Sequence, residues 1–120
     1  MQSSENTLPV LDPNTIDALV AALENEVFEL FDEFVTDVQL ELESLHEMAK
    51  SQRWQEMAMV THTIKGCGGN LGASSFAAAC QVLEDTVKAE QGQDLDGLIH
   101  SVETEFQKAK EAMQKISSGR

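Results

Sequence analysis

Apolar residues recur at intervals of three and four along most of this 120-residue chain, and this spacing constrains the fold more than any other feature. It places side chains on one face of an α-helix, which has about 3.6 residues per turn. No segment is predicted as a strand. The longest stripe predicts a helix over residues 26–50, and its members are Val27, Phe31, Phe34, Val35, Val38, Leu42, Leu45 and Ala49.

Four further stripes predict the other helices. A short first helix begins at Asp12-Pro13, with Asp12 as its cap, and ends near Glu24. The third predicted helix runs from Arg53 to Leu71, and Gly72 ends it. The fourth begins with Ser74 or Ser75 as its cap and extends to about Glu90. A turn at Gln91-Gly92-Gln93 follows, and Asp94 caps the last helix. Together these elements predict an all-α fold, an antiparallel four-helix bundle with a short additional N-terminal helix as a lid.

The length suits one domain with one core, which we expect over residues 11–117. Residues 1–10 and 118–120 are predicted to be flexible tails. No apolar run approaches the roughly 20 residues that a membrane-spanning helix needs. The first residues do not place a basic segment before an apolar one, so we expect no secretory signal and no membrane association.

The formal net charge of −13 makes nucleic acid an unsuitable partner, because phosphate binding needs a positive surface. The charge is uneven: residues 1–49 hold 12 acidic residues and no Lys or Arg. The two cysteines, Cys67 and Cys80, both fall on predicted apolar faces. We interpret them as core residues of a reduced, cytoplasmic protein rather than as a disulfide framework.

One polar face of the third predicted helix has an unusual composition. On a helical projection, the residues that share this face with His62 are Gln55, Ala58, Met59, Lys65, Gly66 and Gly69. The opposite, apolar face holds Met57, Val60, Ile64, Cys67 and Leu71, while Gly68 points inward. Each glycine inside a helix costs about 0.5–1 kcal/mol relative to alanine. Glycines on the face of His62 therefore indicate a surface that another macromolecule approaches closely.

Neutral imidazole is a good nucleophile at cytoplasmic pH and can carry a phosphoryl group. Lys65, one turn after His62, can place a positive charge beside that group. No glycine-rich phosphate loop follows a strand, and no Ser/His/Asp set can be assembled. His46 and His100 are interpreted as surface residues, and the Glu43–His46 spacing is not repeated on another helix, so neither a metal site nor a cofactor is predicted.

The run from Thr61 to Asp85, THTIKGCGGNLGASSFAAACQVLED, closely resembles the signature of histidine phosphotransfer (HPt) domains of multistep phosphorelays. The matching positions are His62, Lys65, Gly66, Leu71, Gly72, Ala73, Cys80, Leu83 and Glu84. The resemblance extends over about residues 11–115. Ile64 and Thr61 depart mildly from the family pattern, and neither lies on the face of His62.

This resemblance implies a phosphocarrier rather than an enzyme. Because no kinase or nucleotide-binding segment is seen in the same sequence, we expect a free-standing carrier, and we expect it to be a monomer. A receiver domain carrying an aspartyl phosphate would dock over the third helix, and His62 would take the phosphoryl group through Nε2 and pass it to another receiver. Lys65 would stabilise the phosphoryl charge, and Gly66 would give steric access. The docking surface would include Gln55, Ala58, Met59 and Gly69, and Mg²⁺ would belong to the receiver. A hybrid sensor kinase is a further candidate partner.

Two alternatives stay open at the level of sequence. The first is a helical adaptor that binds a receiver or other signalling partner through the same face without carrying phosphate. The second, less favoured, is a metal-binding bundle. Acid-labile phosphorylation at His62 distinguishes the carrier from the adaptor, and metal analysis of the purified protein tests the other alternative.

Overall fold

The computed structural model describes residues 8–89 and 94–119. Within these ranges the chain forms five α-helices and no strand. The helices are α1 (Pro13–Leu23), α2 (Glu26–Lys50), α3 (Trp54–Asn70), α4 (Ser74–Lys88) and α5 (Leu95–Ser118). The predicted all-α class is confirmed, and the predicted bounds of α2 match the observed ones.

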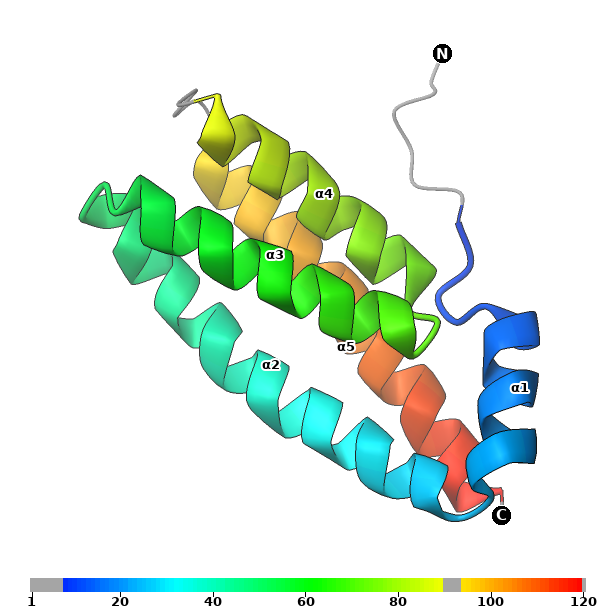
Figure 1. Ribbon diagram of the computed structural model, residues 1–120. Helices are drawn as coiled ribbons and strands as arrows, with labels where there is room; N and C mark the ends of the chain where they lie inside the picture. Colours follow the sequence, from blue (N-terminus) through cyan, green and yellow to red (C-terminus); the bar gives the residue numbers. More distant parts are fainter. Residues whose placement is uncertain (1–7, 90–93, 120) are drawn as a thin grey trace.

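The four long helices, α2 to α5, form an antiparallel bundle in which each packs against two neighbours (Figure 1). The neighbouring pairs are α2 with α3, α3 with α4, α4 with α5, and α5 with α2. The short helix α1 packs against α2 beside one end of the bundle. It is tied to the α3–α4 turn by the Asp12 N–H, which donates to the Gly72 carbonyl at 2.7 Å. None of the described helices is long and apolar enough to cross a membrane.

Three phenylalanine rings from three helices form the centre of the core. Phe34 of α2 lies 5.6 Å from Phe76 of α4 and 5.7 Å from Phe106 of α5, measured between ring centroids. Such pairs contribute about 0.5–1.5 kcal/mol beyond the burial of their area. The remaining helix of the bundle, α3, contacts this cluster through Gly68, where an added Cβ would lie 2.5 Å from a Phe76 ring carbon. The glycine therefore allows α3 to pack closely against α4.

The buried side of α3 differs from the predicted one. The buried residues of this helix are Met57, Thr61, Ile64 and Gly68. Cys67, expected in the core, is exposed, and Val60 is only half-buried. The core side of α3 is thus turned toward Thr61 and Gly68, because the glycine accepts the Phe76 ring. Thr61 is satisfied there by donating its hydroxyl to the Met57 carbonyl at 2.7 Å.

Helix ends also differ in detail from the prediction. Ser74 is the first residue of α4 rather than its cap, and its side chain makes no capping bond. Instead, the Ser75 N–H donates to the Pro9 carbonyl at 3.0 Å, so a distant segment satisfies one free N–H of the first turn. Asp94 precedes α5 as predicted, but in a left-handed conformation with φ of 56° and without a side-chain capping bond.

Three further boundaries need correction or fall outside the described residues. Helix α4 ends at Lys88, and the predicted turn at residues 91–93 and the predicted end at Glu90 lie outside those residues. Helix α5 extends through Ser118, where a flexible end was expected. Most of the expected N-terminal tail also lies outside them, but Pro9 contacts α4 and Val10 packs against the core.

Candidate functional site

His62 projects from the face of α3 that lies away from the core. Its side chain is 66% exposed, whereas its neighbours Thr61 and Ile64 are buried and fix the rotation of the helix. Gly66 and Gly69 lie on the same open face, and a Cβ added at either would meet no atom within 4 Å. The surface beside the imidazole is therefore low and unobstructed.

A buried carboxylate from the neighbouring helix contacts this imidazole. Glu84 of α4 has a side chain that is only 2% exposed, and its Oε2 lies 3.0 Å from His62 Nδ1. Glu84 matches the family signature in the sequence but was not among the predicted site residues. One signal was present, because Glu84 falls within the apolar stripe of Cys80, Leu83 and Val87, where an acidic residue needs a partner.

Two lysines complete the contacts of Glu84. The ammonium of Lys65 lies 2.9 Å from Oε1, and that of Lys88 lies 2.8 Å from Oε2. Burial disfavours the charged form of Glu84, but the hydrogen bonds from Lys88, Lys65 and His62 outweigh it and hold the pKa of Glu84 at about 2. The carboxylate is consequently ionised at neutral pH and accepts all three hydrogen bonds.

This contact determines which nitrogen of His62 is free. An ionised carboxylate only accepts hydrogen bonds, so Nδ1 carries the hydrogen and donates it to Glu84. In the neutral ring the lone pair is then on Nε2, which points away from Glu84. The arrangement presents a nucleophilic nitrogen on an exposed face, with a buried negative charge behind the ring that can stabilise an imidazolium.

The predicted docking residues are only partly brought together. A shallow depression beside the imidazole is lined by Ala58, Met59, His62, Thr63, Glu84 and Lys88. Met59 is exposed and Ala58 is half-buried within it. Gly69 is exposed about two turns further along α3. Gln55 is exposed too, but it lines a separate depression with Trp54 at the start of the helix.

The other histidines and the cysteines lie in different surroundings. His46 is partly buried between α2 and α5, with Nδ1 3.4 Å from Asp96 and Nε2 3.3 Å from Glu103. His100 is exposed. Cys80 is fully buried in the core, as predicted, and this burial raises the pKa of its thiol to about 12. No group of His, Cys, Asp and Glu in the described part of the chain could hold a metal ion.

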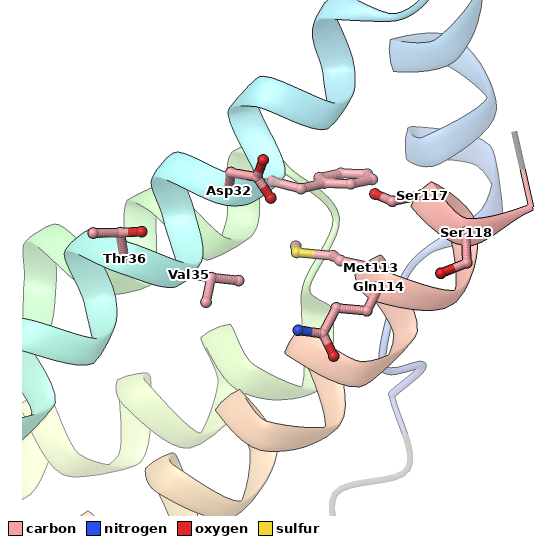
Figure 2. Close-up of a pocket in the computed structure, with 8 residues that line it drawn as sticks. Asp32, Val35, Thr36, Met113, Gln114, Ser117 and Ser118 are labelled. Atoms are coloured by element: carbon pink, nitrogen blue, oxygen red, sulfur yellow. The ribbon is translucent and has the colours of Figure 1, made fainter.

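Another pocket lies between the first half of α2 and the last turns of α5. It is lined by Phe31, Asp32, Val35, Thr36, Met113, Gln114, Ser117 and Ser118. Figure 2 shows side chains from the two helices on either side of the opening. Its lining includes one carboxylate and no histidine, lysine or cysteine, and we assign it no chemistry.

The site consists of an exposed histidine on α3 that is held by a buried carboxylate from α4. Comparison of the sequence with models of known families identifies the class of protein that has this arrangement. The Hpt domain family model matches residues 29–116, and the chain belongs to this family. It is therefore a histidine phosphotransfer protein of phosphorelays, a phosphocarrier rather than an enzyme, whose partners are the receiver domains of response regulators.

A solved structure resembles the whole domain. The crystal structure of histidine-containing phosphotransfer protein B from Pseudomonas aeruginosa PAO1 matches with a TM-score of 0.88 and 28% sequence identity. The match covers 93% of this chain and 97% of that one. No curated protein sequence matched this chain significantly.

Proposed function

We propose that His62 accepts a phosphoryl group from the aspartate of one receiver domain and passes it to the aspartate of another. The observation that carries this proposal is the contact between His62 Nδ1 and the buried carboxylate of Glu84, at 3.0 Å, on an otherwise open face. It leaves Nε2 free for attack. Neither His46 nor His100 combines exposure with such a buried partner.

The transfer is an in-line displacement at phosphorus. The Nε2 lone pair attacks the phosphorus of the aspartyl phosphate, the N–P bond forms, and the bond to the aspartyl oxygen breaks. The aspartate leaves with the electron pair. Because the ring keeps its hydrogen on Nδ1, it becomes positively charged, and the carboxylate of Glu84 stabilises that charge. The second transfer reverses these steps on another receiver.

Glu84 acts in this scheme as a positioning residue, because it holds the ring and its tautomer without contacting the phosphoryl group. Lys65 holds Glu84 in turn and adds positive potential on one side of the imidazole. Gly66 keeps the approach to Nε2 clear, since nothing occupies the space where its side chain would be. Transfer needs the reacting atoms within about 3–3.5 Å, so a side chain at this position would hold the receiver away.

The receiver would dock on the exposed surface around Met59 and Ala58, extending to Gly69 and Gln55. The lysines beside His62 complement an acidic receiver pocket that holds Mg²⁺, which favours association in this orientation. A hybrid sensor kinase as a further partner, the monomeric state and the cytoplasmic location remain predictions of the sequence.

The proposal is tested by transfer from a phosphorylated receiver to variants that each lack one histidine. Wild-type protein and His100→Gln are expected to acquire acid-labile phosphate, and His62→Gln is expected to acquire none. His100 is a matched control because it is also exposed and lies outside the site. Binding of the receiver by all three proteins without any labelling would instead support the adaptor. Label that persists in His62→Gln would contradict the assignment of His62.

A further inference from the structure

The two lysines that contact Glu84 are not equivalent, and the difference bears on how the phosphoryl group is held. Lys65 is one turn beyond His62 on α3, and Lys88 is one turn beyond Glu84 on α4. Because α3 and α4 are antiparallel neighbours, the two ammonium groups approach the His62–Glu84 contact from opposite directions along the helices. Each ammonium contacts a different oxygen of the Glu84 carboxylate.

The ammonium of Lys65 is already committed to protein groups. It donates to Glu84 Oε1 at 2.9 Å and to Gln81 Oε1 at 2.8 Å, and its side chain is only 23% exposed. Gln81 is itself held by Asp85, to which its amide donates at 2.8 Å. Moving Lys65 toward a phosphoryl group would break two hydrogen bonds to protein groups, one of them to a buried charge.

Lys88 is freer to move. Its side chain is 61% exposed, and among the described residues its ammonium contacts only Glu84. That contact is with Oε2, the oxygen that also accepts from His62 Nδ1. Lys88 also lines the depression beside His62, whereas Lys65 does not. Glu84 raises the pKa of Lys88, so this ammonium stays charged at neutral pH.

Phosphorylation would create a demand for such a cation. A phosphoryl group on Nε2 brings a charge of about −1.5 to −2 close to the ionised Glu84. The phosphoryl group and the Glu84 carboxylate are both negative and therefore repel one another, and the repulsion is stronger because Glu84 is buried. An ammonium that can turn from Glu84 toward the phosphoryl oxygens relieves it without breaking a second bond.

On these grounds, and on the basis of the proposed function, we propose that Lys88 binds the phosphoryl group of phosphorylated His62 directly. Lys65 remains with Glu84 and Gln81 and acts on the phosphoryl group only through its charge. The phosphoryl-binding site of this protein is therefore formed by two helices, with the nucleophile on α3 and the mobile cation on α4.

The test uses no receiver, so that binding of the phosphoryl group is separated from docking. The full-length protein is phosphorylated with phosphoramidate; Nε2 attacks phosphorus, the P–N bond breaks, and ammonia leaves with the electron pair. The variants are Lys88→Gln, Lys65→Gln and the control Lys108→Gln. Lys108 is also an exposed lysine with one carboxylate partner, Glu105 at 3.1 Å, but it lies on α5, which does not neighbour α3.

We expect Lys88→Gln to take up phosphate roughly three- to tenfold more slowly than wild type, as loss of a partly exposed charge contact implies. The ³¹P resonance of the phosphorylated protein should titrate with a phosphoryl pKa that is raised by roughly half a unit in Lys88→Gln and by less in Lys65→Gln. Lys108→Gln should match wild type in both measurements.

A phosphoryl pKa that is unchanged in Lys88→Gln, or raised more by Lys65→Gln, would overturn the assignment of Lys88 and leave the role of His62 intact. Wild-type protein that acquires no phosphate on His62 would contradict the proposed function and this inference together. Because the side chain of Lys88 is largely exposed, the variant is expected to fold, and circular dichroism on each sample checks this.

Discussion

Replacing Glu84 with glutamine removes one charge and one acceptor at the point where His62, Lys65 and Lys88 meet. In the wild type, two carboxylate oxygens accept three hydrogen bonds at 3.0, 2.9 and 2.8 Å. Glutamine has one acceptor oxygen and one NH₂ group. Either orientation of the amide therefore places a donor against another donor, at Lys65 in one case and at Lys88 and His62 in the other.

The size of the effect follows from these contacts. Hydrogen bonds to a charged group contribute about 1.5–3 kcal/mol each, and burying a neutral amide costs less than burying a carboxylate, which offsets part of the loss. We expect a net destabilisation of about 1–3 kcal/mol, measured by urea unfolding at pH 7. The imidazolium that forms during transfer loses its charged partner as well. We expect this loss of transition-state stabilisation to slow phosphotransfer roughly 10- to 100-fold, since about 1.4 kcal/mol corresponds to a tenfold change in rate.

The matched control is Glu103→Gln, which makes the same change at the partner of another histidine. Glu103 lies 3.3 Å from His46 Nε2, between α2 and α5, and is not part of the His62 contacts. The Glu103→Gln protein should accept the phosphoryl group at the wild-type rate. Both variants and the wild type are assayed with one phosphorylated receiver under single-turnover conditions. A folded Glu84→Gln protein that transfers at the wild-type rate would refute the positioning role of Glu84.

Three further predictions concern docking, packing and pH. Gly66→Gln should keep the melting temperature at or above that of the wild type, because its Cβ meets no atom, yet slow transfer from a receiver at least about tenfold; normal transfer would mean that the partner docks elsewhere. Gly68→Ala should lower the free energy of unfolding by about 1–3 kcal/mol, because its Cβ would overlap the Phe76 ring, and unchanged denaturant unfolding would contradict the close packing. The pKa of Glu84 is about 2 in the folded protein and 4.5 ordinarily, so its contribution to stability is complete above about pH 4.5 and is lost as the pH falls toward 2. The free energy of unfolding of Glu84→Gln should therefore fall less than that of the wild type over this range. Parallel plots of unfolding free energy against pH for the two proteins would be inconsistent with the lowered pKa.

The fold was largely predictable because its signal is local and repeated. The stripe that begins at Val27 runs without interruption to the end of α2, so hydropathy alone gives both its bounds and its buried face. The prediction was wrong where a residue distant in the sequence determines which side chain is buried or how a helix end is capped. Cys67 was assigned to the core by its apolar character, but it is exposed. Gly68, which was correctly predicted to point inward, occupies the core side because it accepts the ring of Phe76 from another helix. Likewise, the carbonyl of Pro9 replaces the expected serine cap.

The candidate site divides in the same way. The exposed face shared by His62, Lys65 and Gly66 follows from positions on one helix, so a projection is enough to find it. The roles of Glu84 and Lys88 depend on how α4 is paired with α3, which no single-helix pattern contains. An acidic residue within an apolar stripe indicates a buried partner, but the identity of that partner required the structure.

The most direct test of the central claim locates the phosphorus atom on the ring. Protein labelled with ¹⁵N on histidine is phosphorylated by a receiver, and the coupling between ³¹P and each imidazole nitrogen is measured by NMR. We predict coupling to Nε2 of His62, with Nδ1 still protonated and bonded to Glu84. Coupling to Nδ1, or a phosphorylated His46 or His100, would contradict the account.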